Sequence, residues 1–515
     1  MFVTVFIDWM IMQMKQEQCA GYAFLVKKYE LKVLPHWHIS LVGSGGVIRS
    51  RIHDGQEESI FPPSYWPGDS IGDHLEFALK YDGVNLGILS MLFAVVAQEE
   101  ITSWIISKPT GKYVRKIWFF FELLTGKKLP IDNLRTGNYI DLLETDRYYT
   151  AMPGERAKRY RIIDNLLGSK DFCPVIRRTE RLAGMESIDI RQLCDDMVKS
   201  YPPDLLRRAL GYLYGKETKS SFEIERLKPS VSRTERFISL LETATHKDFC
   251  ERQLLIDVQN RIVDARFRDD DYRVNQNYIG QRISLNDQRI HYVCPKPEDL
   301  PALMSGLILS HKKMMKAGVP AVIHAAAISY GFVYMHPFED GNGRIHRFLI
   351  HNILFLKNAV PRGLMFPVSA AMLKNPDLYD LSLEVFSKPL MGLVKYDLDH
   401  SERMTVRGET GHLYRYIDMT SQAEALYEFV RVTIEEELTE ELSFLADYDT
   451  TRSNIQEIVD MPDRLLDLFI KLCMQNHGRL SDRKKESHFS LLTEDELTSM
   501  EQVVQQHLYH HQSSR

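Results

Sequence analysis

The sequence predicts a mainly α-helical protein built from several parts. From about Met185 to the end, apolar residues recur three and four positions apart, which is the period of helices with one buried face. The main interruption is a short run of β-branched and aromatic residues around a turn. The chain has 515 residues, which is too many for one ordinary core, so we expect more than one domain.

In the first part, residues 1–150, we expect a lobe that contains helices. Residues 71–96 carry apolar clusters at helical spacing, with Asp73 as the expected N-cap. Residues 109–126 predict a second helix, opened by a proline and a glycine and closed by a glycine. The aromatic run at 118–121 inside it is expected to be core. The sequence assigns this lobe no ligand.

The remaining chain divides into three further segments by pattern. We expect a helical lobe at 151–245, a catalytic core at 246–400 and a helical region at 401–515. Within the core, residues 278–293 predict a β-hairpin, because β-branched and aromatic residues flank a turn-prone centre. Helical patterns follow the hairpin without a long loop.

Composition and charge favour a folded protein of the cytoplasm. The chain is 44% hydrophobic and 26% charged, and its formal net charge of -6 gives no reason to expect nucleic-acid binding. The 6 scattered cysteines lack the spacing of a zinc site and fit a reducing compartment. Residues 1–14 are apolar but interrupted by Asp8, which favours a buried edge or a misplaced start over a signal peptide. No stretch approaches the ~20 apolar residues of a membrane span, so no membrane is expected.

The run "HPFEDGNGRIHR", residues 336–347, concentrates chemistry that other segments lack. Gly341, Asn342 and Gly343 stand where an apolar helical pattern restarts, so backbone N–H groups and the helix dipole point at one place. Such a place binds anions, and the glycines let a phosphate approach closely. Arg344 and Arg347 are three apart and share one flank of the helix, which suits a ligand with several phosphates.

Two further groups flank this phosphate site. Asp340 precedes it and offers the single carboxylate that a magnesium–phosphate complex usually takes from a protein. His336 ends the preceding helix, where Pro337 turns the chain away, and can accept a proton from an attacking hydroxyl. His346 lies off the arginine flank and is expected to be a packing or surface residue, and Phe338 a core anchor.

At every specified position the run resembles the signature of the Fic family, H-P-F-x-[D/E]-G-N-G-R-x-x-R. The resemblance extends from about Phe249 to Tyr396, and the flanks look like those of longer bacterial Fic proteins. It implies a Fic (Fido) helical core with a β-hairpin flap between helical N-terminal and C-terminal lobes. It also implies a protein adenylyltransferase (AMPylator), which moves AMP from ATP to a hydroxyl side chain of a target protein and releases pyrophosphate.

The resemblance implies a role for each motif residue. His336 would be the general base, Asp340 would hold Mg²⁺, and Asn342 with the Gly341 and Gly343 backbone would steady the α-phosphate. Arg344 would bind the β-phosphate and Arg347 the γ-phosphate. The catalytic group proper would then be His336, Asn342 and Arg344.

The hairpin would be the family's flap, which pins the target as an added strand. The candidate target-binding residues are Ile279, Gly280, Ile290, His291, Tyr292 and Val293. For adenine, Asn375 and Tyr379 are candidates, although both can equally be ordinary helix residues.

Upstream of the core, the chain partly matches a second family signature, the inhibitory helix [S/T]-x-x-x-E-[G/N]. Ser221 and Glu225 occupy its first and fifth places, while Arg226 stands where glycine or asparagine is usual. A Glu225 carboxylate paired with Arg347 would displace the γ-phosphate and leave ATP in an unproductive pose.

Two alternatives remain open at this point. The fold can use another donor or run in the de-AMPylating direction, or the protein can be a nucleotide-switched regulator without catalysis. The target protein is not identified by the sequence, and a homo-oligomer is left open.

Overall fold

The computed structural model describes residues 17–53, 56–283, 288–361 and 364–508. Residues 1–14, for which a buried edge or a misplaced start was predicted, lie outside these ranges, and so does the centre of the predicted hairpin turn. The spatial contacts between Cα atoms divide the chain into two compact units. Unit 1 comprises the chain up to 187, residues 243–357 and residues 377–426, and unit 2 comprises 188–242, 358–376 and the chain from 427. The four-segment division of the sequence stays a prediction.

The first part of unit 1 contains a sheet that the sequence did not predict. Its strands follow the order β1-β2-β4-β3, with β2 parallel to β4 and the other neighbours antiparallel. The strands are β1 (Gln18–Cys19), β2 (His38–Val42), β3 (Arg49–His53) and β4 (Gln56–Phe61). These strands are short and β3 is mostly exposed, so the sequence lacks the long alternation of apolar and polar residues that would predict them. A second small sheet has the order β5-β7-β6, from β5 (Ile140–Asp141), β6 (Glu155–Ala157) and β7 (Ile162–Asp164).

The helices of this part include those predicted at 71–96 and 109–126, together with others that were not predicted. They are α2 (Gly21–Lys28), α3 (Ile71–Phe77), α4 (Leu86–Val95), α5 (Gln98–Ser107), α6 (Lys112–Thr125) and α7 (Glu180–Glu186). The expected cap of α3 was wrong by three residues: Ser70 is the N-cap, and its hydroxyl accepts from the Asp73 backbone N–H at 3.1 Å. The pattern at 71–96 also splits, because Gly83 takes φ 95 and breaks the helix before α4.

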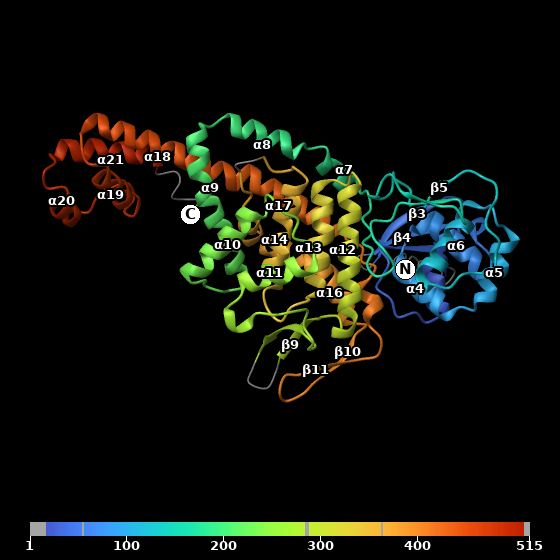
Figure 1. The fold of residues 1–515 in the computed structure, drawn as a ribbon. Coiled ribbons are helices and arrows are strands. Elements are labelled where there is room, and N and C mark those ends of the chain that lie inside the picture. The colour runs from blue at the N-terminus through green and yellow to red at the C-terminus, as the bar shows by residue number, and fades with distance from the viewer. Residues whose placement is uncertain (1–16, 54–55, 284–287, 362–363, 509–515) are drawn as a thin grey trace, which may run out of the picture. The chain divides into compact units, whose positions relative to one another are not determined.

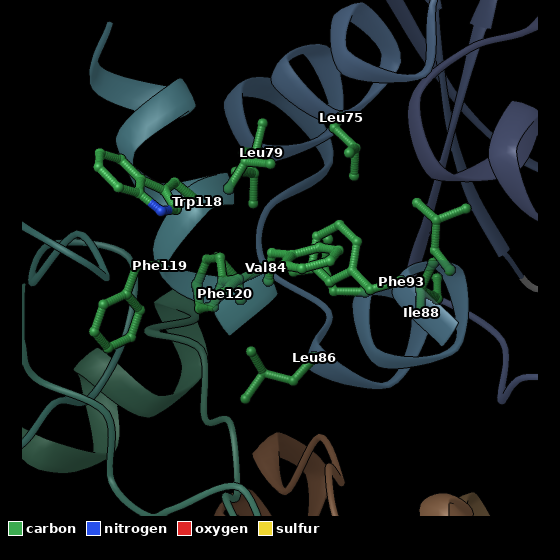
Figure 2. Close-up of a cluster of buried hydrophobic side chains, with 14 of the residues drawn as sticks. Leu75, Leu79, Val84, Leu86, Ile88, Phe93, Trp118, Phe119 and Phe120 are labelled. Atoms are coloured by element: carbon green, nitrogen blue, oxygen red, sulfur yellow. The ribbon is translucent and has the colours of Figure 1, made fainter. Parts of the chain in front are cut away.

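The aromatic run of α6 is core, as predicted. Trp118, Phe119 and Phe120 are all buried in one apolar cluster with residues of α3 and α4. Figure 2 shows Phe119 on the side of α6 away from α4, where its ring packs on Tyr160 with centroids 5.2 Å apart. Gly111 and Gly126 cap the helix, the latter in the left-handed region at φ 70, which confirms the expected glycine boundaries.

The rest of unit 1 is a helical bundle with two hairpins at one end (Figure 1). Its elements are α11 (Arg252–Ile262), β8 (Tyr278–Arg282), β9 (Gln288–Val293), α12 (Leu300–Lys316), α13 (Ala321–Met335), α14 (Asn342–Leu356), α16 (Pro376–Met391), β10 (Lys395–Leu398), β11 (Met404–Arg407) and α17 (Thr420–Val432). α13 packs between α12 and α14 and is buried on all sides, so it is apolar around its whole circumference. The predicted hairpin at 278–293 is confirmed, with a bulge between Ile279 and Gly280.

The described residues of unit 2 form helices joined by loops, and they contain no strand. The unit contains α8 (Ile190–Lys199), α9 (Pro203–Ile224), α10 (Val231–Thr243), α15 (Val368–Lys374), α18 (Thr439–Ile458), α19 (Asp463–Met474), α20 (Asp482–His488) and α21 (Glu494–Leu508). Its C-terminal helices enclose a separate apolar cluster that includes Leu466, Phe469 and Met500. The mainly α class is therefore confirmed.

No single helix in the described chain is long and apolar enough to cross a membrane. Only α4 and α5 reach that composition when counted together, and they are bent by 113° at their junction.

Candidate functional site

His336 ends α13 in a left-handed backbone conformation. Its φ and ψ are 47° and 57°, and its N–H closes the last turn on the Phe332 carbonyl at 3.0 Å. Such a conformation is uncommon for a residue with a side chain and persists where surrounding contacts hold it. Here Pro337 prevents the helix from continuing, and the Arg273 guanidinium donates to the His336 carbonyl at 2.8 Å.

The His336 imidazole is prepared to act as a base. Its Nδ1 lies 3.2 Å from the Val333 carbonyl, so Nδ1 carries the proton and Nε2 keeps its lone pair. The pKa of His336 is lowered to about 4: burial is the main cause and the Arg273 charge adds to it, while the Val333 hydrogen bond and the Asp340 charge act in the opposite direction. The ring is therefore neutral at pH 7.

The loop between α13 and α14 is closed by Asn342. Its Oδ1 accepts from the Phe338 N–H at 3.0 Å and its Nδ2 donates to the Phe338 carbonyl at 2.7 Å. Phe338 is fully buried beside Phe332 and Tyr272, which confirms it as the loop's core anchor. Because both amide atoms of Asn342 bind the loop, the structure places its side chain in the scaffold, and its backbone N–H remains as the group for a phosphate.

The start of α14 has the backbone geometry on which the predicted anion site depends. Gly341 is the N-cap at φ 91, and no described side chain caps this end. The first N–H groups of a helix have no acceptor inside it, so those of Asn342, Gly343 and Arg344 point out of the helix end. One neighbouring donor is already used, since the Gly341 N–H bonds the Asp340 carboxylate at 2.6 Å.

Asp340 and Arg344 form an ion pair with each other. The Arg344 guanidinium donates to Asp340 Oδ1 at 2.8 Å and to the Ile262 carbonyl at 3.3 Å, and the arginine is fully buried. The carboxylate assigned to the metal thus neutralises the guanidinium assigned to the β-phosphate. Arg347, one turn further along α14, is also buried.

The donor set fits a magnesium ion carried mainly by phosphates. Among the described residues, no group of three or more His, Cys, Asp and Glu side chains is arranged to hold a metal on its own. Asp340 has a side chain that is 47% exposed, and magnesium bound to a triphosphate needs only one or two protein carboxylates. A second carboxylate, Asp269, accepts from the Glu339 N–H at 3.2 Å, and burial together with Glu339 and Asp340 raises its pKa.

His346 and Tyr379 lie together on the packed side of α14. The His346 ring is buried, with its centroid 4.8 Å from that of Tyr330 and 6.3 Å from that of Tyr379. His346 is therefore a packing residue, one of the two roles predicted. Asn375 caps the end of α15 in unit 2, whereas Tyr379 belongs to unit 1, so the structure does not bring the two adenine candidates into one unit.

The flap candidates divide into exposed and anchoring residues. Gly280 and His291 are exposed, Ile279 is 43% exposed and Ile290 is half-buried. Tyr292 and Val293 are buried instead. The Tyr292 hydroxyl donates to the Tyr334 carbonyl, and the Tyr414 hydroxyl donates to the Val293 carbonyl at 2.7 Å. The side chains of Tyr292 and Val293 thus fix the flap to the bundle, and the binding of a target by these residues stays a prediction.

The second hairpin, β10–β11, contacts the flap. Glu402 in its turn forms an ion pair with Arg282, and its carbonyl lies 3.4 Å from the Tyr278 hydroxyl. The flap is therefore attached to the second hairpin both near its turn, through Arg282, and near its base, through Tyr278.

Sequence reasoning missed Arg273, which joins the flap to the motif loop. This buried guanidinium donates to the carbonyls of His336, Asn275 and Pro295 at 2.8, 2.7 and 2.6 Å. Asn275 and Pro295 flank the two flap strands, so one side chain holds both hairpin ends against His336. No local pattern marks Arg273, because its partners are far away in the sequence.

The segment that resembles an inhibitory helix ends α9 in unit 2. Ser221 is buried in the last turn and Glu225 is the half-buried C-cap. Arg226 takes φ 57, its N–H bonds the Glu223 carbonyl at 2.8 Å, and the Leu227 N–H bonds the Phe222 carbonyl at 3.0 Å. This is a complete Schellman cap, whose left-handed residue is usually glycine. Arg226 keeps the geometry that the family signature's glycine or asparagine favours.

Comparisons with known proteins identify the segment around the motif. A Fic family protein from Desulfovibrio desulfuricans matches with a TM-score of 0.37 and 16% identity, over 61% of this chain and 85% of that one. A Fic domain containing signaling protein from Bacteroides thetaiotaomicron matches with a TM-score of 0.35 and 17% identity, over 50% and 97%. Residues 248–354 match the model of the Fic/DOC family, whose members generally transfer nucleotide-derived groups to proteins. The matched segment contains the hairpin, α13 and the loop from His336 to Arg347, so this part of the chain is a Fic/DOC domain.

Proposed function

We propose that the protein is a magnesium-dependent protein adenylyltransferase that transfers AMP from ATP to a hydroxyl side chain of a target protein. The observation that carries this proposal is the neutral His336 imidazole, with its Nε2 lone pair, held next to the bare N-terminus of α14. A scaffold has no need for a base at that place.

The proposed reaction needs few groups. His336 Nε2 accepts the proton of the target hydroxyl as its oxygen attacks the α-phosphorus, and the bond from that phosphorus to pyrophosphate breaks. The N–H groups at the start of α14 stabilise the charge on the α-phosphate, while Arg344 and Arg347 hold the leaving phosphates. Magnesium, held by Asp340 and the phosphates, supplies neutralising charge when it is bound.

The Asp340–Arg344 ion pair gives the proposal a binding step. A triphosphate that uses Arg344 and a metal that uses Asp340 must together replace the 2.8 Å contact between these side chains. A metal ion at Asp340 and a triphosphate at Arg344 carry opposite charges, so each favours binding of the other. We therefore expect ATP and magnesium to bind synergistically.

We further propose that Glu225 restrains the enzyme. The partial signature and the Schellman cap, which fixes the backbone at Glu225 and Arg226, support this role. The restraint would act by pairing the Glu225 carboxylate with Arg347 and so excluding the γ-phosphate.

Incubation with labelled ATP and magnesium tests the activity directly. Label from the α-phosphate, but not the γ-phosphate, should remain on protein, and Glu225→Gly should increase it. His336→Ala should abolish labelling, whereas His400→Ala, an exposed histidine in the β10–β11 turn, should not. Retention of γ-label would favour another transfer chemistry, and absence of label from every nucleotide, also with Glu225→Gly, would favour the non-enzymatic regulator.

A further inference from the structure

Unit 1 contains a second cavity that the proposed reaction does not use. Its volume is about 350 Å³, within the usual range for small-molecule sites. It is lined by residues 33–37, the start of α4, one face of α16 and the segment 412–421, and no residue of 336–347 contributes.

The cavity walls are mainly apolar and aromatic. The principal side chains are Leu34, Trp37, Ile88, Phe386, Leu413 and Ile417. Ile88, which Figure 2 labels, also belongs to the buried core of the N-terminal part, so this wall is fixed by the core behind it. A flat apolar ring could bury both faces against these walls without covering a polar group that would then lack a hydrogen-bond partner.

One positive charge lies among the lining residues. Arg177 stacks over the Trp37 ring, with the guanidinium carbon 4.6 Å from the ring centroid. Its Nε donates to Asp418 at 2.9 Å, and no acceptor among the described residues binds its two terminal nitrogens. Burial lowers the pKa of His36, to about 4, and that of His412, so both rings are neutral. The cavity therefore offers the Arg177 guanidinium to an anion, next to the Asp418 carboxylate that already binds its Nε.

The inner wall of the cavity is shared with the attachment of the flap. Phe386 packs on Tyr334 with ring centroids 4.5 Å apart, on Tyr414 at 6.1 Å and on Tyr292 at 6.3 Å. We call these four residues the aromatic anchor. Two of its hydroxyls hold β9, through the Tyr292–Tyr334 and Tyr414–Val293 hydrogen bonds, and Tyr334 lies two residues before His336. An occupant that touches Phe386 therefore presses on the group that positions the flap and the end of α13.

We propose that this cavity binds a small planar aromatic carboxylate, with its ring between the apolar walls and its carboxylate on Arg177, and that occupancy tightens the flap through the aromatic anchor. The site is separate from the nucleotide chemistry and does not depend on it.

Calorimetric titration with indole-3-carboxylate tests the binding site. The full-length protein should bind it saturably and bind the neutral indole-3-carboxamide about tenfold more weakly, which corresponds to about 1.4 kcal/mol for a charge-assisted contact. Arg177→Gln should remove that preference, and Asp418→Asn should preserve or increase it, because the competing carboxylate is gone.

A pair of α16 variants controls for the location. Val385 lines the cavity and is 43% exposed, so Val385→Trp can fill the space from a tolerant position. Leu381, 56% exposed on the same helix, does not line it, and Leu381→Trp is the matched control. Binding should be lost in the first variant and kept in the second. Equal binding of the carboxylate and the carboxamide, unchanged binding in Val385→Trp, or no saturable binding would overturn the site.

Hydrogen exchange tests the coupling. Saturating indole-3-carboxylate should slow exchange of the β9 amides several-fold, and Tyr292→Phe, which lacks the hydroxyl that bonds Tyr334, should reduce this effect while binding persists. Unchanged β9 exchange at saturation would overturn the coupling. His336→Ala should bind the probe as the unaltered protein does, so failure here and failure of AMP transfer are distinguishable.

Discussion

Several helices of this protein end at a non-glycine residue in the left-handed conformation, and two of these ends, those of α13 and α9, differ in what holds them. His336 ends α13 at φ 47, and Arg226 follows α9 at φ 57. His336 is held by long-range contacts, chiefly the buried Arg273 guanidinium on its carbonyl. Arg226 is exposed and held by the Schellman hydrogen bonds of its own helix. The backbone strain at His336 is imposed by tertiary contacts, whereas the left-handed conformation of Arg226 is imposed only by the hydrogen bonds that end its own helix.

The largest effect in this comparison should come from His336 itself. His336→Ala removes the base and should lower the rate of AMP transfer by about 10²–10⁴-fold, the usual contribution of a positioned base. Unfolding by urea should change little, because the loop is held by Arg273 and Asn342. Transfer at the original rate would remove the base assignment.

The second largest effect should come from loss of the contact between Arg273 and the His336 carbonyl. Arg273→Met removes a buried guanidinium that donates to three carbonyls and should reduce the free energy of unfolding by about 3 kcal/mol or more. It should also increase hydrogen exchange across the flap. The matched variant Arg226→Met, on the exposed cap, should stay within about 0.5 kcal/mol of the original protein. Equal destabilisation by both would contradict the distinction between the two helix ends.

The pH profile tests how far burial controls His336. A base must be deprotonated, and a pKa lowered to about 4 keeps this imidazole neutral as pH falls well below 6.5. We expect initial rates of transfer to be nearly constant from pH 7.5 to about 5.5 and to decline only as pH approaches 4. A midpoint near pH 6.5 would show that the ring is solvated as an ordinary histidine.

The smallest effect should be a gain at Arg226. Arg226→Gly relieves the left-handed strain of a side chain and should stabilise unit 2 by about 1 kcal/mol in thermal or urea unfolding. Arg226→Ala retains a β-carbon and should give no such gain. If alanine and glycine stabilise equally, loss of the arginine side chain is the cause and not the backbone.

The sequence alone determined the elements whose signals are local. The loop from His336 to Arg347, the hairpin at 278–293, the glycine caps of α6 and the mainly α class all follow from spacing within a few residues, where helix and strand periods act. The core role of Phe338 followed in the same way.

Only the tertiary structure decided the contacts between distant segments. It joined Tyr292 to Tyr334 and Val293 to Tyr414, and it brought Arg273 to His336 across 63 positions. It also formed the N-terminal sheet and the cavity beside α16. Spacing along a chain reports which residues share a face of one element, but not which elements meet, since that depends on the packing of all of them together.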